Sequence, residues 1–179
     1  MKSKIVVACL CALSFVACNG GKSRAEKTDG VEGTVLSPLT TDLLLLVGTY
    51  TSDGSSKGIY LYSFDAATGK SDSLSVAGTD NPSYLTLSPD EKFVYAVGEN
   101  EESNSAAVAF ALDKRSGVLR YLNASQTGSP GPCYIEIDEA GKSVLTANYT
   151  GGSISLFRVN EDGSLSAADA VIQFKGSGP

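Results

Sequence analysis

The chain has 179 residues, of which 42% are hydrophobic and 19% charged, the composition of a globular domain of ordinary size. Its 20 Asp and Glu residues outnumber its 14 Lys and Arg residues, and an acidic surface repels the phosphate backbone of nucleic acids, so we expect no nucleic-acid partner. The chain contains no histidine and no C-x-x-C pair. We therefore predict neither a metal site nor another cofactor.

The first 17 residues have the pattern of an export signal. Lys2 and Lys4 give a short basic start, and residues 5–17 form an apolar run that is too short to span a bilayer but suits the core of a signal peptide. The run ends in small residues before Cys18, which is similar to the lipobox of bacterial lipoproteins, although Phe15 stands where Leu is usual. An ordinary signal peptide with a nearby cysteine is the alternative.

Residues 18–42 are polar and lack any apolar periodicity, as expected of a flexible tether. We therefore predict a signal peptide at 1–17, a linker at 18–42 and a folded domain at 43–179. Cys18 would carry the lipid, and the protein would be exported and held on a bacterial membrane, on its periplasmic or cell-surface side. Cys133 is then the cysteine left in the folded domain, so no internal disulfide is expected.

The folded domain repeats itself. Residues 82–97 align without a gap with residues 132–147, at a spacing of 50. In the unit that starts near residue 82, alternating apolar residues and turn clusters predict four strands, at 83–87, 93–98, 106–112 and 118–124. Four short antiparallel strands in each repeat of 46–50 residues indicate the blades of an all-β protein, a β-propeller.

The folded domain is too short to form a closed propeller. Residues 43–179 amount to slightly less than three repeats, whereas propellers close with about four to eight blades. The first unit starts at its second strand, and Gly178-Pro179 repeats Gly131-Pro132, where another innermost strand would begin. We therefore expect an incomplete copy of a larger propeller. A complete three-bladed protein within an oligomer is the alternative.

Antiparallel topology places particular loops on one face. The residues before the first strand, after the second strand and before the third strand of each unit gather on a common rim, and the Asp/Gly hairpins gather on the opposite face. Glycine, aromatic, amide and carboxylate residues converge on this rim, which suits a small polar ligand with a ring. The predicted substrate-binding residues are Tyr50, Tyr84, Tyr134, Asn148 and Tyr149, and the predicted catalytic base is Glu99.

Each of these residues also has a structural alternative. Tyr84 and Tyr134 recur in register and would equally suit packing between blades, whereas Asn148 would suit a backbone turn. Glu99 opens an acidic run that would suit a solvated loop. Among the arginines, we expect Arg115, Arg120 and Arg158 to lie in strands or in the opposite turn, so no cationic residue is predicted on the rim.

These segments resemble the propeller-type lactonase family, the non-classical 6-phosphogluconolactonases. The resemblance rests on Val47-Gly48-Thr49-Tyr50-Thr51, Asn81-Pro82-Ser83-Tyr84-Leu85, Ser88-Pro89-Asp90, Ala147-Asn148-Tyr149 with Gly151-Gly152-Ser153, and Gly176-Ser177-Gly178-Pro179. It implies a propeller of seven blades, of which about three are present. It also implies hydrolysis of a sugar δ-lactone in carbohydrate metabolism, such as 6-phosphogluconolactone. The resemblance places the family's His and Arg site residues beyond the Gly-Ser-Gly-Pro segment, and Tyr134 stands where a His often follows Pro-Cys.

The chemistry of lactone opening fits these candidates. A base must activate water, which Glu99 can do, and a donor must hold the developing oxyanion, which the rim tyrosines or Asn148 can do. A phosphate group would require Arg or Lys, and an exported protein does not meet cytoplasmic sugar phosphates, so an unphosphorylated lactone is favoured. Two other functions stay open: a lipid-anchored propeller that binds glycans or proteins without chemistry, and a muconate-type lactone cyclase.

Overall fold

The computed structural model describes residues 4–9, 43–101 and 104–176. These residues form twelve strands in three four-stranded sheets and contain no helix, so the all-β prediction is confirmed. Among the described residues, no helix offers the length and apolar character that crossing a bilayer requires. Cys18 and the predicted linker at 18–42 lie outside the described residues, so the lipid anchor and the tether stay predictions.

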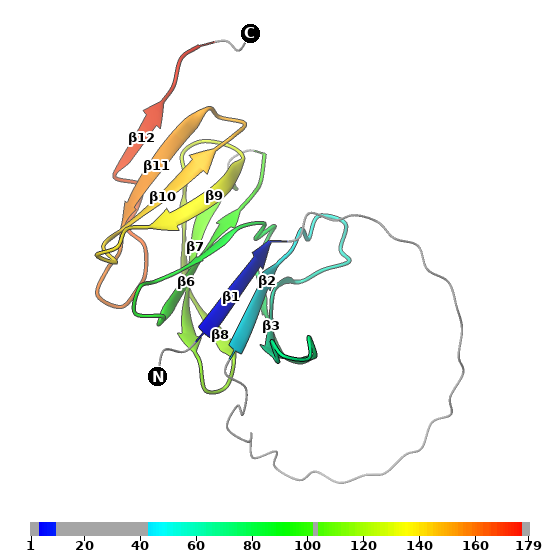
Figure 1. Cartoon of the computed structure of the whole chain (residues 1–179). Coiled ribbons are helices and arrows are strands. Elements are labelled where there is room, and N and C mark those ends of the chain that lie inside the picture. The colour runs from blue at the N-terminus through cyan, green and yellow to red at the C-terminus, as the bar shows by residue number, and fades with distance from the viewer. Residues whose placement is uncertain (1–3, 10–42, 102–103, 177–179) are drawn as a thin grey trace.

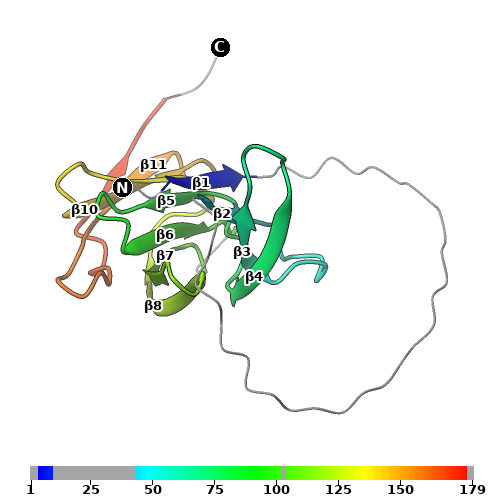
Figure 2. The ribbon, with the colours of Figure 1, turned by 60° about the horizontal axis from the view of Figure 1, so that its bottom comes forward.

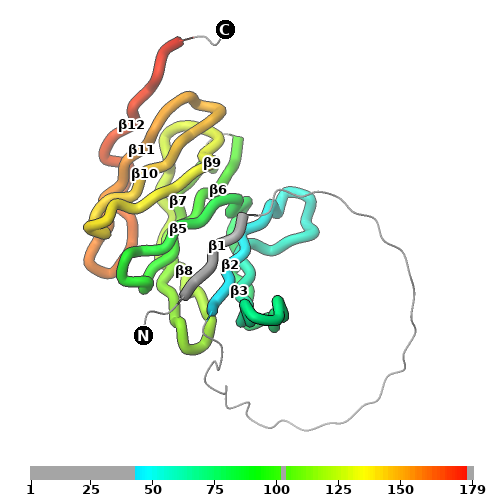
Figure 3. The backbone as a smooth tube through the Cα atoms, in the orientation of Figure 1, coloured from blue at the N-terminus to red at the C-terminus, as the bar shows by residue number. Residues whose placement is uncertain are grey.

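Each sheet is built from strands in chain order, as Figures 1 and 3 show. Blade 1 contains β1 (Lys4–Cys9), β2 (Leu43–Gly48), β3 (Gly58–Phe64) and β4 (Ser71–Gly78). Blade 2 contains β5 (Leu85–Leu87), β6 (Phe93–Gly98), β7 (Ala106–Asp113) and β8 (Val118–Gln126). Blade 3 contains β9 (Pro132–Ile137), β10 (Ser143–Asn148), β11 (Ser153–Arg158) and β12 (Ala170–Gln173).

The strands of blade 2 follow the sequence-based prediction closely. β6 has the predicted bounds, and β7 and β8 extend the predicted strands at their C-terminal ends by one and two residues. β5 starts at Leu85, two residues later than expected. Pro82 has no N–H for a ladder, and Asn81 has a positive φ of 42°, so the chain turns before it joins the sheet.

Blade 1 departs from the expected antiparallel pattern at its inner edge. β1 pairs with β2 in parallel, with Lys4 opposite Leu43, whereas the other paired strands of the described sheets are antiparallel. The sequence predicts that this segment belongs to a removable signal and that blade 1 begins at its second strand. The structure places β1 in the vacant inner position, and cleavage before Cys18 would remove it and leave β2 at the inner edge.

Two apolar cores hold the blades together. Side chains such as Leu46 and Leu61 of blade 1 pack against Val94 and Phe110 of blade 2. The other face of blade 2, with Tyr95, packs against blade 3. Blade 2 lies between its neighbours (Figure 2), which explains why β6 is buried at nearly every position while β2 alternates between buried and half-buried residues.

The hairpin turns that lead from β3 to β4 and from β7 to β8 share one design. A carboxylate oxygen of Asp65 accepts a hydrogen bond of 2.9 Å from the main-chain N–H of Ala67, and its other oxygen accepts one of 2.7 Å from the Thr68 hydroxyl. Asp113 makes equivalent bonds to Arg115 and Ser116. These bonds to the charged form lower the pKa of both carboxyls, with the side-chain hydroxyl as the largest cause.

Candidate functional site

Asn81 connects the loops of the predicted rim. Its buried side-chain oxygen accepts hydrogen bonds from the Thr51 N–H at 2.8 Å and from the Ser52 hydroxyl at 2.9 Å. Its side-chain nitrogen donates to Oδ1 of Asn100 at 2.9 Å, and its main-chain oxygen accepts from the Glu99 N–H at 3.1 Å. Asn81 therefore joins the loop after β2, its own turn before β5 and the loop after β6, and confirms that these segments share one face.

Glu99, the predicted base, lies within this junction. The Tyr50 hydroxyl donates a hydrogen bond of 2.8 Å to Oε2 of Glu99, and the Ser83 hydroxyl donates to the same oxygen. Tyr50 comes from blade 1, whereas Ser83 and Glu99 come from blade 2. Two hydroxyl donors on a single oxygen fix the orientation of the half-buried carboxylate. Ser83 has no role in the sequence-based prediction, although its place in the repeated Pro-x-Tyr segment indicates the rim.

Tyr84 and Tyr134 meet across two blades at the inner strands. Their ring centroids lie 4.7 Å apart with an angle of 51° between the ring planes. The Tyr134 hydroxyl donates to Oε2 of Glu136 at 2.9 Å, and the Thr86 hydroxyl donates to Oε1 of Glu136 at 3.2 Å. The hydrogen bond to Glu136 raises the pKa of Tyr134, and the negative charge of Glu136 adds to the effect.

Glu136 is not among the site residues predicted from the sequence, although its place in the repeat distinguishes it. It occupies the position that Thr86 holds one repeat earlier, 50 residues before it, so a carboxylate replaces a hydroxyl on the inner strand. Alternation along β9 leaves Tyr134 and Glu136 exposed while Ile135 is fully buried between them.

Asn148 lies inside the protein. Only 2% of the residue is exposed, and its side-chain nitrogen donates to the hydroxyls of Ser153 at 3.0 Å and Ser155 at 2.8 Å. Its side-chain oxygen accepts from the Thr146 hydroxyl at 3.0 Å. The structure therefore favours the structural alternative for Asn148, because its polar atoms are engaged within blade 3 and it shapes the end of β10.

Tyr149 follows Asn148 and lies on the rim. Its main-chain N–H donates to the carbonyl oxygen of Gly131 at 2.7 Å, which ties the loop after β10 to the start of β9. The residue is 84% exposed, so its ring stands in solvent at the edge of the rim. The structure thus brings Tyr50, Tyr84, Tyr134, Tyr149 and Glu99 to one face and places Asn148 beneath it.

The rim also carries a lysine that the sequence analysis overlooked. Lys57 precedes Gly58, the first residue of β3, so the expectation of a rim without cations is wrong. The topology itself indicates this place, since residues before a third strand belong to the rim. Lys57 lines a hollow of about 480 Å³ that also includes Asn100 at the end of β6 and Tyr121 on β8, between blades 1 and 2.

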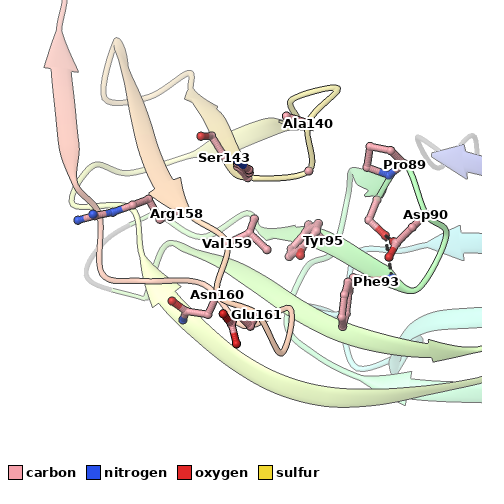
Figure 4. Close-up of a pocket in the computed structure, with 13 residues that line it drawn as sticks. Pro89, Asp90, Phe93, Tyr95, Ala140, Ser143, Arg158, Val159, Asn160 and Glu161 are labelled. Carbon is pink, nitrogen blue, oxygen red and sulfur yellow. Dashed lines mark hydrogen bonds between the residues drawn. The ribbon is translucent and has the colours of Figure 1, made fainter.

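A larger pocket of about 650 Å³ lies on the opposite face (Figure 4). Phe93, Tyr95 and Val159 line its centre between the Pro89–Asp90 turn and the Asn160–Glu161 turn. Several of its charges are satisfied within the fold: Asp90 pairs with Lys92 at 3.1 Å and Arg158 with Asp169 at 2.6 Å. No predicted site residue lines this pocket, and we place the candidate site on the rim.

The described residues contain no group of three or more His, Cys, Asp or Glu residues arranged to hold a metal ion. The polar groups that the rim presents are hydroxyls, amides, the side chain of Lys57 and the carboxylate of Glu99, which accepts hydrogen bonds. Such a set can orient a polar ring, accept a proton and donate hydrogen bonds to an oxyanion.

Sequence comparison finds related enzymes. The chain is 35% identical over 136 residues to a 6-phosphogluconolactonase of Formosa agariphila and 35% identical over 134 residues to a 6-phosphogluconolactonase of Bacillus subtilis. These alignments cover 75% and 74% of this chain but 38% of each relative. The chain thus spans well under half the length of the curated relatives it matches.

Structural comparison gives the same picture. A candidate 6-phosphogluconolactonase of Bacteroides fragilis superposes with a TM-score of 0.73 at 49% identity, over 83% of this chain and 40% of that one. The periplasmic gluconolactonase of Pseudomonas aeruginosa superposes with a TM-score of 0.66 at 38% identity, over 72% of this chain and 37% of that one. The family described as "Lactonase, 7-bladed beta-propeller" matches residues 44–179, and with three consecutive blades of this architecture the chain belongs to that lactonase propeller family.

Proposed function

We propose that the protein hydrolyses the δ-lactone of a sugar acid, with Glu99 as general base. The observation that carries the proposal is the placement of Glu99: Tyr50 and Ser83 from two blades orient one carboxylate oxygen, Oε2. The family membership and the 6-phosphogluconolactonase relatives support lactone chemistry. The same rim holds the aromatic pair of Tyr84 and Tyr134, which offers a surface for a pyranose ring.

The proposed reaction needs one base and one oxyanion donor. Oε1 of Glu99 takes a proton from water while the water oxygen forms a bond to the lactone carbonyl carbon. Tyr149 donates a hydrogen bond to the carbonyl oxygen as it becomes negative, since the hydroxyl proton of Tyr50 is already given to Glu99. The bond between the carbonyl carbon and the ring oxygen then breaks, and the proton on Glu99 passes to the ring oxygen. The product is the open-chain sugar acid, and Glu99 returns to its initial state.

The other predicted residues serve binding. Tyr84 and Tyr134 would pack against the sugar ring, and Tyr149 would close the rim from blade 3. Asn148 contributes by holding the end of β10 in place through Ser153 and Ser155, so we assign it to positioning. The sugar-ring contacts need no metal, and we propose none.

Export is part of the proposal. The signal pattern at 1–17 and Cys18 would place the enzyme on the outer side of a bacterial membrane, held by lipid. The periplasmic gluconolactonase of Pseudomonas aeruginosa supports an exported relative of this fold. In that place the enzyme would act in carbohydrate metabolism on lactones that form outside the cytoplasm.

A direct assay tests the proposal. The chain, its Glu99→Gln variant and its Glu101→Gln variant would be assayed for hydrolysis of glucono-δ-lactone, with the spontaneous rate subtracted. Loss of a general base lowers the rate by about 10²–10⁴-fold, so Glu99→Gln should be nearly inactive. Glu101 lies in the same loop, with a 3.5 Å contact to Thr150, and its variant should keep full activity. Equal rates for the two variants would remove Glu99 from its proposed role, and no catalysis by the unmodified chain would sink the proposal for this chain.

A binding function is the second candidate, and one observation favours it. The tilted pair of Tyr84 and Tyr134 would suit stacking on a glycan even without catalysis. A chain that binds neutral sugars through these tyrosines but leaves every lactone intact would support this lipid-anchored binding protein. Formation of a lactone from a muconate would instead support the cyclase.

A further inference from the structure

Glu136 joins the inner strands of blades 2 and 3. Its carboxylate accepts three hydrogen bonds: Oε1 accepts from Thr86 on β5 at 3.2 Å and from the main-chain N–H of Ile137 at 3.3 Å, and Oε2 accepts from Tyr134 on β9 at 2.9 Å. Both strands are the innermost of their sheets. The carboxylate therefore lies where two blades meet, beside the ring pair of Tyr84 and Tyr134.

The side chain remains open to solvent although it bridges two blades. Glu136 is exposed, and 41% of Tyr134 is exposed next to it. An ionised carboxylate offers about four lone-pair directions, and Thr86, Ile137 and Tyr134 use three of them. The remaining direction, on Oε2, can accept a hydrogen bond from a hydroxyl group of a ligand that rests on the exposed ring.

The chemistry of Glu136 and the neighbouring ring of Tyr134 favours one class of ligand. A carboxylate accepts hydrogen bonds from sugar hydroxyls and attracts no anion, because like charges repel at short range. An aromatic ring beside it packs against the C–H face of a pyranose. A phosphate group near Glu136 would meet a negative charge. Lys57, a cation on the same rim, lines the separate hollow that reaches from the end of β6 to Tyr121 on β8.

We propose that Tyr134 and Glu136 form a subsite for a neutral, hydroxylated ring and that this subsite selects unphosphorylated sugar lactones. The inference rests on the proposed function for the identity of the ring as a lactone. Glu136 acts on binding only, since the proposed proton transfer belongs to Glu99. Tyr134 is held in place by its bond to Glu136, so the carboxylate both contacts the ligand and orients the ring.

Binding of a stable analogue tests the subsite. D-glucono-δ-lactam is neutral and resists hydrolysis, and its 6-phosphate is the charged counterpart. Titration followed by NMR or by tyrosine fluorescence would compare the chain with its Glu136→Gln and Glu139→Gln variants. The chain should bind the neutral lactam more tightly than the phosphate. Glu136→Gln should weaken binding of the neutral lactam about tenfold, because a hydrogen bond to a charged group is lost. The same variant should therefore show a smaller preference for the neutral lactam over its 6-phosphate.

The control and a second measurement separate binding from folding. Glu139 is an exposed residue of the hairpin on the opposite face, so Glu139→Gln should bind like the unmodified chain. Spectroscopic titration of the tyrosines should also show a lower pKa for Tyr134 in Glu136→Gln, because the bond and the charge that raise it are gone. Unchanged lactam affinity in Glu136→Gln, or tighter binding of the phosphate by the unmodified chain, would overturn the subsite.

The outcomes for the subsite and for the enzyme are distinct. Hydrolysis that depends on Glu99, together with lactam binding indifferent to Glu136, would leave the proposed function standing and reject the subsite. Lactam binding that depends on Glu136, without any lactone hydrolysis, would keep the subsite and reject the enzyme. A chain that does not bind the neutral lactam at all contradicts the subsite directly.

Discussion

The Tyr50 hydroxyl lies 2.8 Å from Oε2 of Glu99 and donates a hydrogen bond that joins blade 1 to blade 2. The two residues are 49 positions apart and follow the second strands of successive blades. The contact therefore depends on the relative placement of the two blades, and the apolar core between them maintains it. The carboxylate that the proposed chemistry needs is thus oriented by the propeller architecture itself.

Asn81 should contribute strongly to stability because it connects three rim segments. Removal of its buried side chain leaves the main-chain N–H of Thr51 without its partner, at a cost of about 1–3 kcal/mol for the unsatisfied donor. Asn81→Ala should lower the free energy of unfolding by at least this amount in urea titrations. Asn81→Gly should be less damaging, because Gly accepts the φ of 42° that costs Ala about 1–2 kcal/mol. Equal stability of Asn81→Ala and Asn81→Gly would contradict the conclusion that the positive φ of residue 81 adds to the cost of the alanine variant.

Two glycines with similar backbone angles provide a matched pair. Gly163 (φ 85°) packs under the Phe93 ring, so an added Cβ would overlap the ring, whereas Gly69 (φ 73°) faces open space. Gly69→Ala should cost about 1–2 kcal/mol, from backbone conformation alone. Gly163→Ala should cost about 1–3 kcal/mol more through overpacking between blades 2 and 3. Thermal unfolding of both variants checks the difference, and equal melting temperatures would contradict the packing.

Tyr95 should make the protein sensitive to alkali. Burial, with smaller contributions from the charges of Asp90 and Asp162, raises the pKa of Tyr95 above its usual value of about 10. A raised pKa in the folded state means that this stabilisation is complete below pH 10 and is lost as the pH rises further. Tyr95→Phe should show a weaker decline in stability above pH 10.

The same variant loses a hydrogen bond at neutral pH. The Tyr95 hydroxyl donates to the carbonyl oxygen of Gly163 at 3.1 Å, so Tyr95→Phe should be less stable at pH 7 by about 1 kcal/mol. Urea unfolding at pH 7 and pH 10.5 measures both effects. An equally steep alkaline decline in the two proteins would show that Tyr95 is not responsible.

The Asp turns should make the protein sensitive to acid. The folded-state pKa values of Asp65 and Asp113 are lowered, first by the hydroxyls of Thr68 and Ser116. A depressed pKa gives stabilisation that is present above the unfolded value of 3.8 and is lost as the pH falls through the folded value. The double variant Asp65→Asn/Asp113→Asn should melt lower than the unmodified chain at pH 6, and the gap should narrow towards pH 3. A difference in melting temperature that is the same at pH 6 and pH 3 would contradict the stabilising role assigned to the ionised Asp65 and Asp113.

Much of the fold follows from the sequence because the repeat is explicit. The alignment of Pro82 and Tyr84 with Pro132 and Tyr134 predicts the blade period and offers packing between blades as one of two roles for the tyrosines, and the structure brings the two rings into contact. Strands 93–98 and 106–112 are correct because alternation and turn residues mark their ends. The parallel pairing of β1 was not predicted, since an apolar run after a basic start has the same composition in a signal peptide and in a strand.

The site is harder to predict than the fold, and the reasons are specific. Asn148 is the last residue of β10, whereas Glu99 follows β6. Hydroxyls from the neighbouring strand β11 enclose Asn148, and this depends on strand register. Glu136 looks like an ordinary exposed strand residue until β5 is placed beside β9. Lys57 could have been found, because the rule that places residues before the third strand on the rim applies to it directly.

The most direct test of the account is a crystal structure of the chain with D-glucono-δ-lactam. We expect the lactam ring to lie against Tyr134, with one of its hydroxyls donating to Oε2 of Glu136. Its carbonyl carbon should lie within about 3–3.5 Å of a water bonded to Glu99. A lactam bound in the opposite pocket, between Phe93 and Val159, or bound on the rim with its carbonyl turned away from Glu99, would contradict the account.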